Sequence, residues 1–188
     1  PEGFTATVIH EGVGSARHMV VRNNGDIYVA LRQRQNGFGI ACLRDADGDG
    51  SYETVEYAGK VQGTGIALDE NWLYFANACQ IKMRTPGSPG MEPCPILEYA
   101  GGIWVYDADK PNQQHTRDGV RYATGLRNCV AIDQHDGAVY AVMHGRDQLD
   151  SLFPDLYTPE QNADLPAEEM FRLEQGNDGG WPYTYYDG

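Results

Sequence analysis

One arrangement of residues occurs three times along the chain and constrains its fold more than any other feature. Each copy has three apolar residues, a polar turn and an apolar strand centred on a tyrosine, and the copies lie at 18–30, 65–76 and 129–141. Strand-forming residues on either side of a tight polar turn predict a β-hairpin. The copies begin 47 and 64 residues apart, close to one propeller blade of about 40 to 50 residues plus insertions. The repeat therefore predicts an all-β chain and favours a β-propeller.

Further strands are expected next to these hairpins, at 38–43, 80–84 and 102–106. Helical periodicity is almost absent. The exception is 164–172, where an aspartate, an early proline and two glutamates suit the start of a short helix. A β-sandwich is the alternative fold, because it also has short strands between regular turns. At this spacing the chain makes about three to four blades, and we expect one propeller domain over 1–188 that is incomplete at its C-terminal end.

The charge and composition exclude several classes of partner. A net charge of −13 argues against binding to nucleic acid or to an anionic membrane, because both need a basic surface. Hydrophobic residues make up 41% of the chain, which is enough for one domain with a core. No apolar run approaches the roughly 20 residues of a membrane-spanning helix. We therefore expect a soluble protein without a membrane span.

The four cysteines have two kinds of surroundings. Cys79 and Cys94 bracket a segment rich in proline and glycine, and a disulfide closing it would stabilise the fold by roughly 3 kcal/mol. Cys42 and Cys129 lie inside apolar strand runs, where buried reduced thiols are common. No Cys-x-x-Cys pair points to a metal site. We expect one disulfide and a periplasmic or secreted protein.

Polar residues gather at both ends of the third hairpin. Arg127 and Asn128 precede its first strand, and its second strand is followed by His144, Gly145, Arg146 and Asp147. Antiparallel pairing would bring the two groups to the same end of the sheet. Two guanidinium groups, an imidazole and an amide suit an anionic ligand with several oxygens, while a carboxylate or nearby carbonyls can hold a cation. The alternative is that these residues are simply hydrated loops at the hairpin ends.

An acidic segment follows the first hairpin. Asp45, Asp47 and Asp49 occupy alternate positions, Gly50 follows, and Glu56 falls where a bidentate ligand would complete a twelve-residue calcium loop. The flanking residues are typical of strands rather than of helices. The alternative is an Asp-Gly-rich turn between two strands of one blade.

The first repeat also carries a candidate functional residue. Arg17 and His18 stand at the start of the first strand of this repeat. In a propeller the innermost strand of each blade borders the central channel, where ligands bind. The alternative for His18 is a hydrogen bond to a neighbouring loop with no functional role.

Four short motifs occur in a fixed order in the second half of the chain: Gly125-Leu-Arg-Asn128, His144-Gly-Arg-Asp-Gln-Leu149, Pro154-Asp-Leu-Tyr157 and Gly180-Trp-Pro-Tyr183. In these motifs the chain resembles the pyrroloquinoline quinone (PQQ)-dependent sugar dehydrogenases of the sorbosone and soluble glucose dehydrogenase type. The resemblance extends over 15–188, and its specific part is 125–186. Members of that family are six-bladed β-propellers. The resemblance therefore implies oxidation of a sugar, or of a related alcohol or aldehyde, by hydride transfer to calcium-bound PQQ.

The resemblance also implies roles for individual residues. Arg127 and Asn128 match the cofactor contacts of the family, and Arg146 and His18 are further candidates for cofactor binding. The carbonyl groups of Gly145 and Arg146, beside Asp147, match the turn that holds the calcium. Independently of the resemblance, the spacing of the acidic segment makes Asp45, Asp47, Asp49 and Glu56 the candidate ligands of a second, structural calcium.

One position departs from this resemblance. In the glucose dehydrogenase branch the general base is a histidine just ahead of the second repeat, and the matching residue here is Gln62. Glutamine does not accept a proton usefully near neutral pH. His144 or His18 is then the candidate base, with Arg127 beside the reacting groups, because histidine titrates in the required range.

Two other functions are compatible with a propeller. A calcium-dependent lactonase or other hydrolase would need carboxylate ligands from several blades, and a non-catalytic binding propeller would need no convergence of charged groups. A dehydrogenase would have a sugar or alcohol substrate and an electron acceptor such as a cytochrome or a quinone. A second chain or a further segment would complete the ring.

Overall fold

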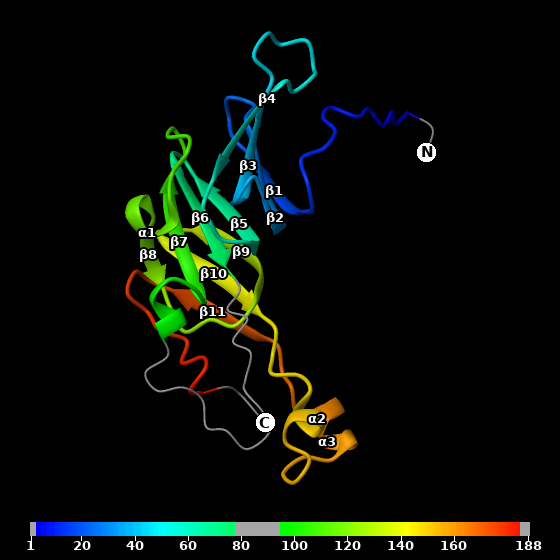
Figure 1. Cartoon of the computed structure of the whole chain (residues 1–188), viewed down its shortest axis with the longest axis vertical. Coiled ribbons are helices and arrows are strands. Elements are labelled where there is room, and N and C mark those ends of the chain that lie inside the picture. The colour runs from blue at the N-terminus through cyan, green and yellow to red at the C-terminus, as the bar shows by residue number, and fades with distance from the viewer. Residues whose placement is uncertain (1–2, 78–94, 185–188) are drawn as a thin grey trace.

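The chain forms antiparallel sheets that follow one another along the sequence (Figure 1). The computed structural model describes residues 3–77 and 95–184. Sheet 1 contains β1 (Ala16–Val21), β2 (Ile27–Gln35), β3 (Phe38–Arg44) and β4 (Thr54–Ala58). Sheet 2 contains β5 (Gly63–Asp69), β6 (Trp72–Asn77), β7 (Gly102–Asp107) and β8 (Val120–Ala123). Sheet 3 contains β9 (Cys129–His135), β10 (Ala138–Met143) and β11 (Glu169–Leu173).

The predicted all-β chain and its three hairpins are confirmed. They are β1 with β2, β5 with β6, and β9 with β10. In the third hairpin Asp136 and Gly137 both have positive φ, 47° and 75°, which matches a tight turn to the twist of its strands. The strands expected at 38–43 and 102–106 are present as β3 and β7. The strand expected at 80–84 and the disulfide between Cys79 and Cys94 lie outside the described residues.

The helix predicted at 164–172 is wrong. Residues Glu169–Leu173 form β11 and pair with β10, and only alternate side chains of β11 turn toward the interior, as in a strand. The helix of this region is α3 (Pro159–Asp164), which ends where the predicted one was to begin. Thr158 and Gln161 form a capping box at its start, with a proline at the first turn. The helix-start signal of Thr158, Pro159 and Gln161 is thus stronger than that of Asp164.

The remaining helices are short. They are η1 (Pro95–Glu98), α1 (His115–Asp118) and α2 (Leu149–Leu152). The α2 and α3 helices form an excursion between β10 and β11 that projects from the end of sheet 3 (Figure 1). Among the helices of the described residues, none has the length or apolar composition to cross a membrane.

The sheets pack through their first strands and through apolar side chains. The first strands are adjacent, because β1 contacts β5 and β5 contacts β9. The core between sheets 1 and 2 includes Tyr28, Ile40, Leu73, Phe75 and Tyr106. The core between sheets 2 and 3 includes Ile103, Leu126, Ile132, Val139 and Leu173. Within the described residues the strands do not close into a barrel or ring, so the propeller stays a prediction.

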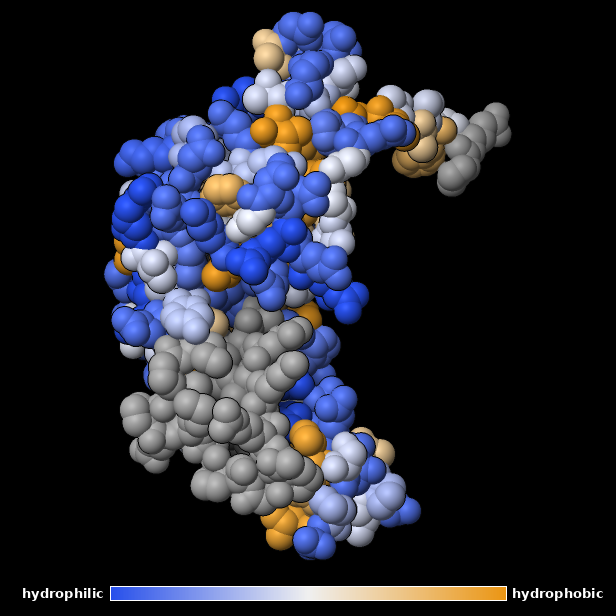
Figure 2. All heavy atoms as spheres, in the orientation of Figure 1, coloured by the Kyte–Doolittle hydropathy of each residue, from blue (hydrophilic) through white to orange (hydrophobic). Residues whose placement is uncertain are grey.

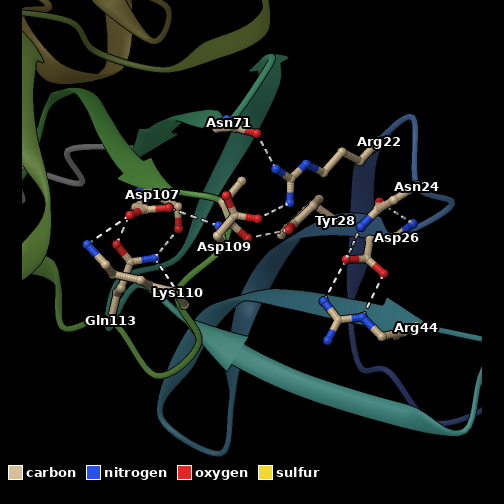
Figure 3. Close-up of polar contacts among 11 residues, drawn as sticks. Arg22, Asn24, Asp26, Tyr28, Arg44, Asn71, Asp107, Asp109, Lys110 and Gln113 are labelled. Carbon is tan, nitrogen blue, oxygen red and sulfur yellow. Dashed lines mark hydrogen bonds and ion pairs between the residues drawn. The ribbon is translucent and has the colours of Figure 1, made fainter. Parts of the chain in front are cut away.

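Polar groups also join sheet 1 to sheet 2 (Figure 3). Arg22, just after β1, donates one hydrogen bond to Asp109 at 2.5 Å and another to Asn71. The Tyr28 hydroxyl donates to the carbonyl of Ala108 at 2.6 Å. These bonds link sheet 1 to one end of the β6–β7 pair, where Trp72 pairs with Asp107, so they fix the two sheets relative to each other.

The two cysteines expected to be buried thiols are buried and free. Burial raises the pKa of Cys42 to about 11 and that of Cys129 to about 12. Because the thiolate is the reactive form, both thiols are unreactive near neutral pH. They contribute to the cores rather than to a site.

Candidate functional site

The polar groups at the two ends of the third hairpin meet at one end of sheet 3, as the sequence predicts. Met143 pairs with Cys129, and the backbone N–H of His144 donates to the carbonyl of Asn128 at 3.1 Å. The chain segments before β9 and after β10 are therefore held side by side. This end of sheet 3 is the candidate functional site.

Arg127 contacts two groups of the turn that follows β10. Its Nη1 donates to the carbonyl of Gly145 at 2.8 Å, and its Nη2 lies 2.6 Å from Oδ1 of Asp147. The Arg127 backbone N–H also contacts the sulfur of Met143 at 2.9 Å. The Gly145 carbonyl, predicted as a calcium ligand, thus accepts a hydrogen bond from a cation in this structure.

Arg146 contacts the same residue, Asp147, through its guanidinium. Its guanidinium donates to the backbone carbonyl of Asp147 at 2.6 Å and lies 3.4 Å from Oδ1 of that residue. Its side chain is only 7% exposed. The guanidinium carbons of Arg127 and Arg146 lie 5.8 and 6.0 Å from the ring centre of Trp181, which is itself buried. Two cations therefore lie close to one indole ring, an arrangement that cation–π attraction favours.

Close backbone approaches bring the motifs together. Gly125 has a φ of 69°, and a Cβ there would lie 1.9 Å from Oδ1 of Asp178. The Trp181 N–H donates to the Gly125 carbonyl at 2.9 Å, so residues 177–181 run directly against 124–125. At Gly145 a Cβ would lie 2.3 Å from the carbonyl oxygen of Ala167. Only glycine permits both approaches, which explains these residues without any ligand.

His144 has a carboxylate partner that the sequence did not predict. Its Nδ1 lies 2.8 Å from Oε2 of Glu168. A carboxylate only accepts, so in the neutral ring Nδ1 carries the proton and Nε2 has the lone pair. The register explains the pair, because Met143 opposes Glu169 and the next residues outward are His144 and Glu168. The expected helix at 164–172 concealed this register.

His18 lies in sheet 1 rather than at the end of sheet 3. Its Nδ1 bonds the backbone carbonyl of Thr64 in β5 at 2.9 Å, so it bridges two sheets. Since a carbonyl only accepts, Nε2 of His18 also keeps its lone pair. Gln62 is exposed just ahead of β5. The structure thus brings together residues 127–128 and 144–147 and places His18 on a neighbouring sheet.

The acidic loop between β3 and β4 gathers four carboxylates. Oxygens of Asp45, Asp47, Asp49 and Glu53 all lie within 4.8 Å of one another. Backbone N–H groups of Gly50 and Gly48 bond the Asp45 carboxylate, and they lower its pKa. The cluster keeps the three predicted aspartates and takes Glu53 in place of Glu56. Glu56 lies within β4, opposite Cys42, because the hairpin replaces the helix that the spacing pattern assumes.

Two cavities lie between the sheets. One of about 400 Å³ is bordered by the first strands of all three sheets, at Val20, Ile66 and Ile132, and by the turns that follow them. The other, of about 110 Å³, lies between sheets 1 and 2 beside Tyr28 and Cys42. The larger cavity shows that β1, β5 and β9 surround a common space.

The surface is largely hydrophilic on the face shown in Figure 2, in keeping with the acidic composition. Exposed apolar side chains of the described residues include Phe4, Met19, Val21, Leu156 and Met170. Figure 2 shows apolar groups near the N-terminal segment and on the excursion that carries α2 and α3. The Pro154–Tyr157 motif belongs to this excursion and not to the strands of sheet 3.

Comparison with known proteins gives similar structures and no similar sequence. No protein-family model matches the chain, and no curated protein matches it. Two solved structures of the Carbohydrate-Active Enzymes family AA12 from Trichoderma reesei are similar. The iodide structure has a TM-score of 0.60 and 14% identity, over 98% of this chain and 60% of that one. The calcium structure has a TM-score of 0.58 and 13% identity, over 94% and 58%.

A third similar structure is the holo form of the PQQ domain of a pyranose dehydrogenase from Coprinopsis cinerea. It matches 74% of this chain and 46% of its own at 14% identity, and its TM-score of 0.34 is too low to support an argument. At these identities the two AA12 structures show a shared fold and nothing further. The chain spans about three fifths of the length of those structures.

Proposed function

We propose that this chain is part of a β-propeller quinoprotein oxidoreductase, which oxidises a sugar or a related alcohol or aldehyde with calcium and PQQ. The observation that carries the proposal is the convergence of Arg127 and Arg146 beside the ring of Trp181, with His144 at the same end of sheet 3. An arginine pair of this kind is suited to planar carboxylates.

The arrangement of the sheets supports a propeller. Three antiparallel sheets follow one another in sequence, and their first strands border one cavity. The similarity in fold to the AA12 structures extends over nearly the whole chain. A complete ring would need strands beyond those described, from a further segment or from a second chain.

The residues at the end of sheet 3 fit an anionic quinone. Its three carboxylates need cationic and amide donors, and Arg127, Asn128 and Arg146 supply them from two chain segments that lie side by side. When bound, the quinone supplies the hydride acceptor, while the protein orients the substrate and sets the charge around it. Trp181 lies next to both guanidiniums, so its ring helps to order these donors before a ligand arrives.

Calcium fits the acidic loop better than the turn at Gly145 and Arg146. The loop offers four carboxylates close together, whereas the Gly145 carbonyl already faces the Arg127 guanidinium. A hard cation prefers anionic oxygens and is repelled by a neighbouring positive charge. One of the similar Trichoderma reesei structures is a calcium structure, in agreement with a role for this ion. Calcium at Gly145 would require Arg127 to turn away.

His144 is the better candidate for the general base. Its Nε2 has a lone pair, and Glu168 fixes the tautomer from the other side of the ring. The same carboxylate stabilises the imidazolium that forms when His144 takes a hydroxyl proton from the substrate. His18 has the same tautomer, but a backbone carbonyl rather than a carboxylate holds its Nδ1.

Reconstitution tests the proposal. The full chain would be titrated with PQQ in the presence of calcium, and binding would be followed through the absorbance of the quinone. Arg127→Ala should weaken binding about tenfold to a hundredfold, because a charge-assisted contact is lost. Arg121→Ala, which removes an exposed arginine of β8, is the matched control and should bind as the unchanged protein does. Equal binding in both variants would remove Arg127 from the site.

A lactonase is the weaker alternative. It would need carboxylate ligands from several blades, but among the described residues the acidic group comes from a single loop. Hydrolysis of a lactone without any quinone binding would nevertheless favour it. A protein that binds sugars with neither activity would favour the non-catalytic propeller.

The partners and the location follow from the proposed chemistry. A dehydrogenase of this kind passes its electrons to an acceptor such as a cytochrome or a quinone. The net charge of −13 favours an acceptor with a basic surface and disfavours nucleic acid. We propose a periplasmic or secreted protein.

A further inference from the structure

We infer that Asp147 is an internal competitor for the anionic ligand of this site, so that a ligand carboxylate must displace it to bind. The inference rests on the proposed function, because it concerns how the same guanidinium pair receives its ligand. Asp147 would then determine the affinity of the site and the charge of the anions that it accepts.

The contacts of Asp147 place it where a ligand carboxylate would bind. Its Oδ1 lies 2.6 Å from Nη2 of Arg127 and 3.4 Å from Nη1 of Arg146. The guanidinium carbons of both arginines lie within 6.0 Å of the ring centre of Trp181. A single carboxylate oxygen thus bridges the two cations that the structure presents at this end of sheet 3.

Both guanidiniums are largely shielded from water. The side chain of Arg146 is 7% exposed and that of Arg127 is 20% exposed. The attraction between opposite charges is stronger where water is excluded, so the carboxylate that occupies this place affects the affinity for any second anion. In the apo protein that carboxylate belongs to Asp147, the residue next to Arg146 in the chain.

The same carboxylate is free to leave. The side chain of Asp147 is 61% exposed, so it can rotate into water without loss of hydration. Its exchange for a ligand carboxylate keeps both guanidiniums paired, and the number of charge-assisted contacts is conserved. The ligand therefore gains the contacts that Asp147 gives up. The free energy of the lost Asp147 contacts is subtracted from the binding free energy of the ligand.

The inference and a calcium role for Asp147 predict opposite results. If Asp147 competes with the ligand, its neutralisation removes the carboxylate that a ligand must displace and strengthens anion binding. If Asp147 helps to hold a cation that bridges the cofactor, its neutralisation weakens cofactor binding. One variant separates these two roles.

The experiment measures anion binding by calorimetry on the full chain, with two probes. The first is benzene-1,3,5-tricarboxylate, which carries three carboxylates and no redox chemistry, and the second is PQQ with calcium. Asp147→Asn should bind both probes about tenfold more tightly than the unchanged protein, through loss of the internal ion pair. Asp136→Asn, at the opposite end of the same hairpin and 88% exposed, is the control and should change neither affinity.

A second measurement does not depend on a stable variant. In the unchanged protein the carboxyl carbon resonance of Asp147 should shift when the tricarboxylate is added, because the carboxylate leaves the guanidiniums. A resonance that stays constant at saturation would overturn the inference. So would Asp147→Asn binding PQQ as tightly as, or more weakly than, the unchanged protein.

The two probes also separate this inference from the proposed function. Tighter tricarboxylate binding in Asp147→Asn without any binding of PQQ supports the competitor role and removes the quinoprotein function. PQQ binding that gains nothing from the substitution removes the competitor role and leaves the function in place. Absence of binding by either probe in both proteins overturns both.

Discussion

Asp26 accepts two hydrogen bonds from the guanidinium of Arg44, at 2.8 and 2.6 Å, across two strand ends of sheet 1 (Figure 3). The Asp26 side chain is 3% exposed and that of Arg44 is 43% exposed. The guanidinium lowers the pKa of Asp26. The pair therefore contributes stability above the unfolded-state pKa of about 4 and loses that contribution as the pH falls through the lower folded-state value.

Substitution of Asp26 should destabilise the protein most near neutral pH. Asp26→Ala leaves a half-exposed guanidinium that water can hydrate, so the expected loss is about 1 to 3 kcal/mol at pH 7. Urea unfolding at pH 7 and at pH 3 would measure it, and the difference from the unchanged protein should shrink at the lower pH. Asp155→Asn, an exposed carboxylate in the helical excursion, should show no such difference. A loss of equal size at both pH values would contradict the assignment.

His115 predicts a second pH dependence. Its Nε2 bonds the carbonyl of Tyr99 at 2.6 Å, so its Nδ1 must accept the hydroxyl proton of Tyr106 at 2.5 Å. Burial lowers the pKa of His115. The unfolded chain then binds this proton more readily, and stability should fall as the pH drops below about 6.5 until the folded-state pKa is reached. His115→Gln should remove this part of the loss between pH 8 and pH 5.5.

The measurement for His115 is the urea midpoint at these two pH values. The exposed His135, on the third hairpin, provides the control through His135→Gln, which should keep the slope of the unchanged protein. An unchanged slope in His115→Gln would show that carboxylates alone account for the pH dependence.

The structure and the sequence spacing name different glutamates for the calcium site of the acidic loop, Glu53 and Glu56 respectively. Calcium should bind the apo protein with a dissociation constant on the order of 0.1 to 1 mM, and the double change Asp45→Ala with Asp47→Ala should abolish binding. Glu53→Gln should weaken binding about tenfold, because Glu53 belongs to the carboxylate cluster. Glu56→Gln should leave it unchanged. Calorimetry with calcium alone measures these affinities. A larger loss of affinity in Glu56→Gln than in Glu53→Gln would favour the twelve-residue calcium loop that the sequence spacing predicts.

The sequence predicted the parts of the site that depend on local rules. The Asp136-Gly137 turn fixes the third hairpin, and antiparallel pairing then places Arg127 near the turn after β10. Trp181 could not be placed in this way, because its position depends on residues 177–181 packing against Gly125 from the far end of sheet 3. A contact between distant residues also changes the role of the turn at Gly145. The carbonyl expected to hold calcium faces a guanidinium instead.

The helix error has the same physical origin. Asp164 and the glutamates after it satisfy the local rules for a helix start, but pairing with β10 outweighs that preference. This error also concealed a contact of the site, because the register of β10 and β11 places Glu168 beside His144 and a helix would not. Glu53 and Glu56 differ for a related reason, because the calcium pattern assumes a helix after the loop and the structure has β4 there.

The pairing of His144 with Glu168 leads to the last prediction. Glu168→Gln keeps an acceptor for Nδ1–H but removes the charge that stabilises the imidazolium, so the rate of proton removal from the substrate should fall. In the reconstituted protein kcat should decrease about 10- to 100-fold, with KM for the sugar and the affinity for PQQ unchanged. Glu174→Gln, which removes the surface partner of Arg172, is the control and should leave kcat unchanged. Nitrogen chemical shifts of His144 give a readout that needs no activity: the Nδ1–H tautomer should dominate in the unchanged protein and become mixed in Glu168→Gln. A kcat that does not respond while the tautomer does would show that Glu168 orients a histidine that is not the base, and His18 would then be the candidate.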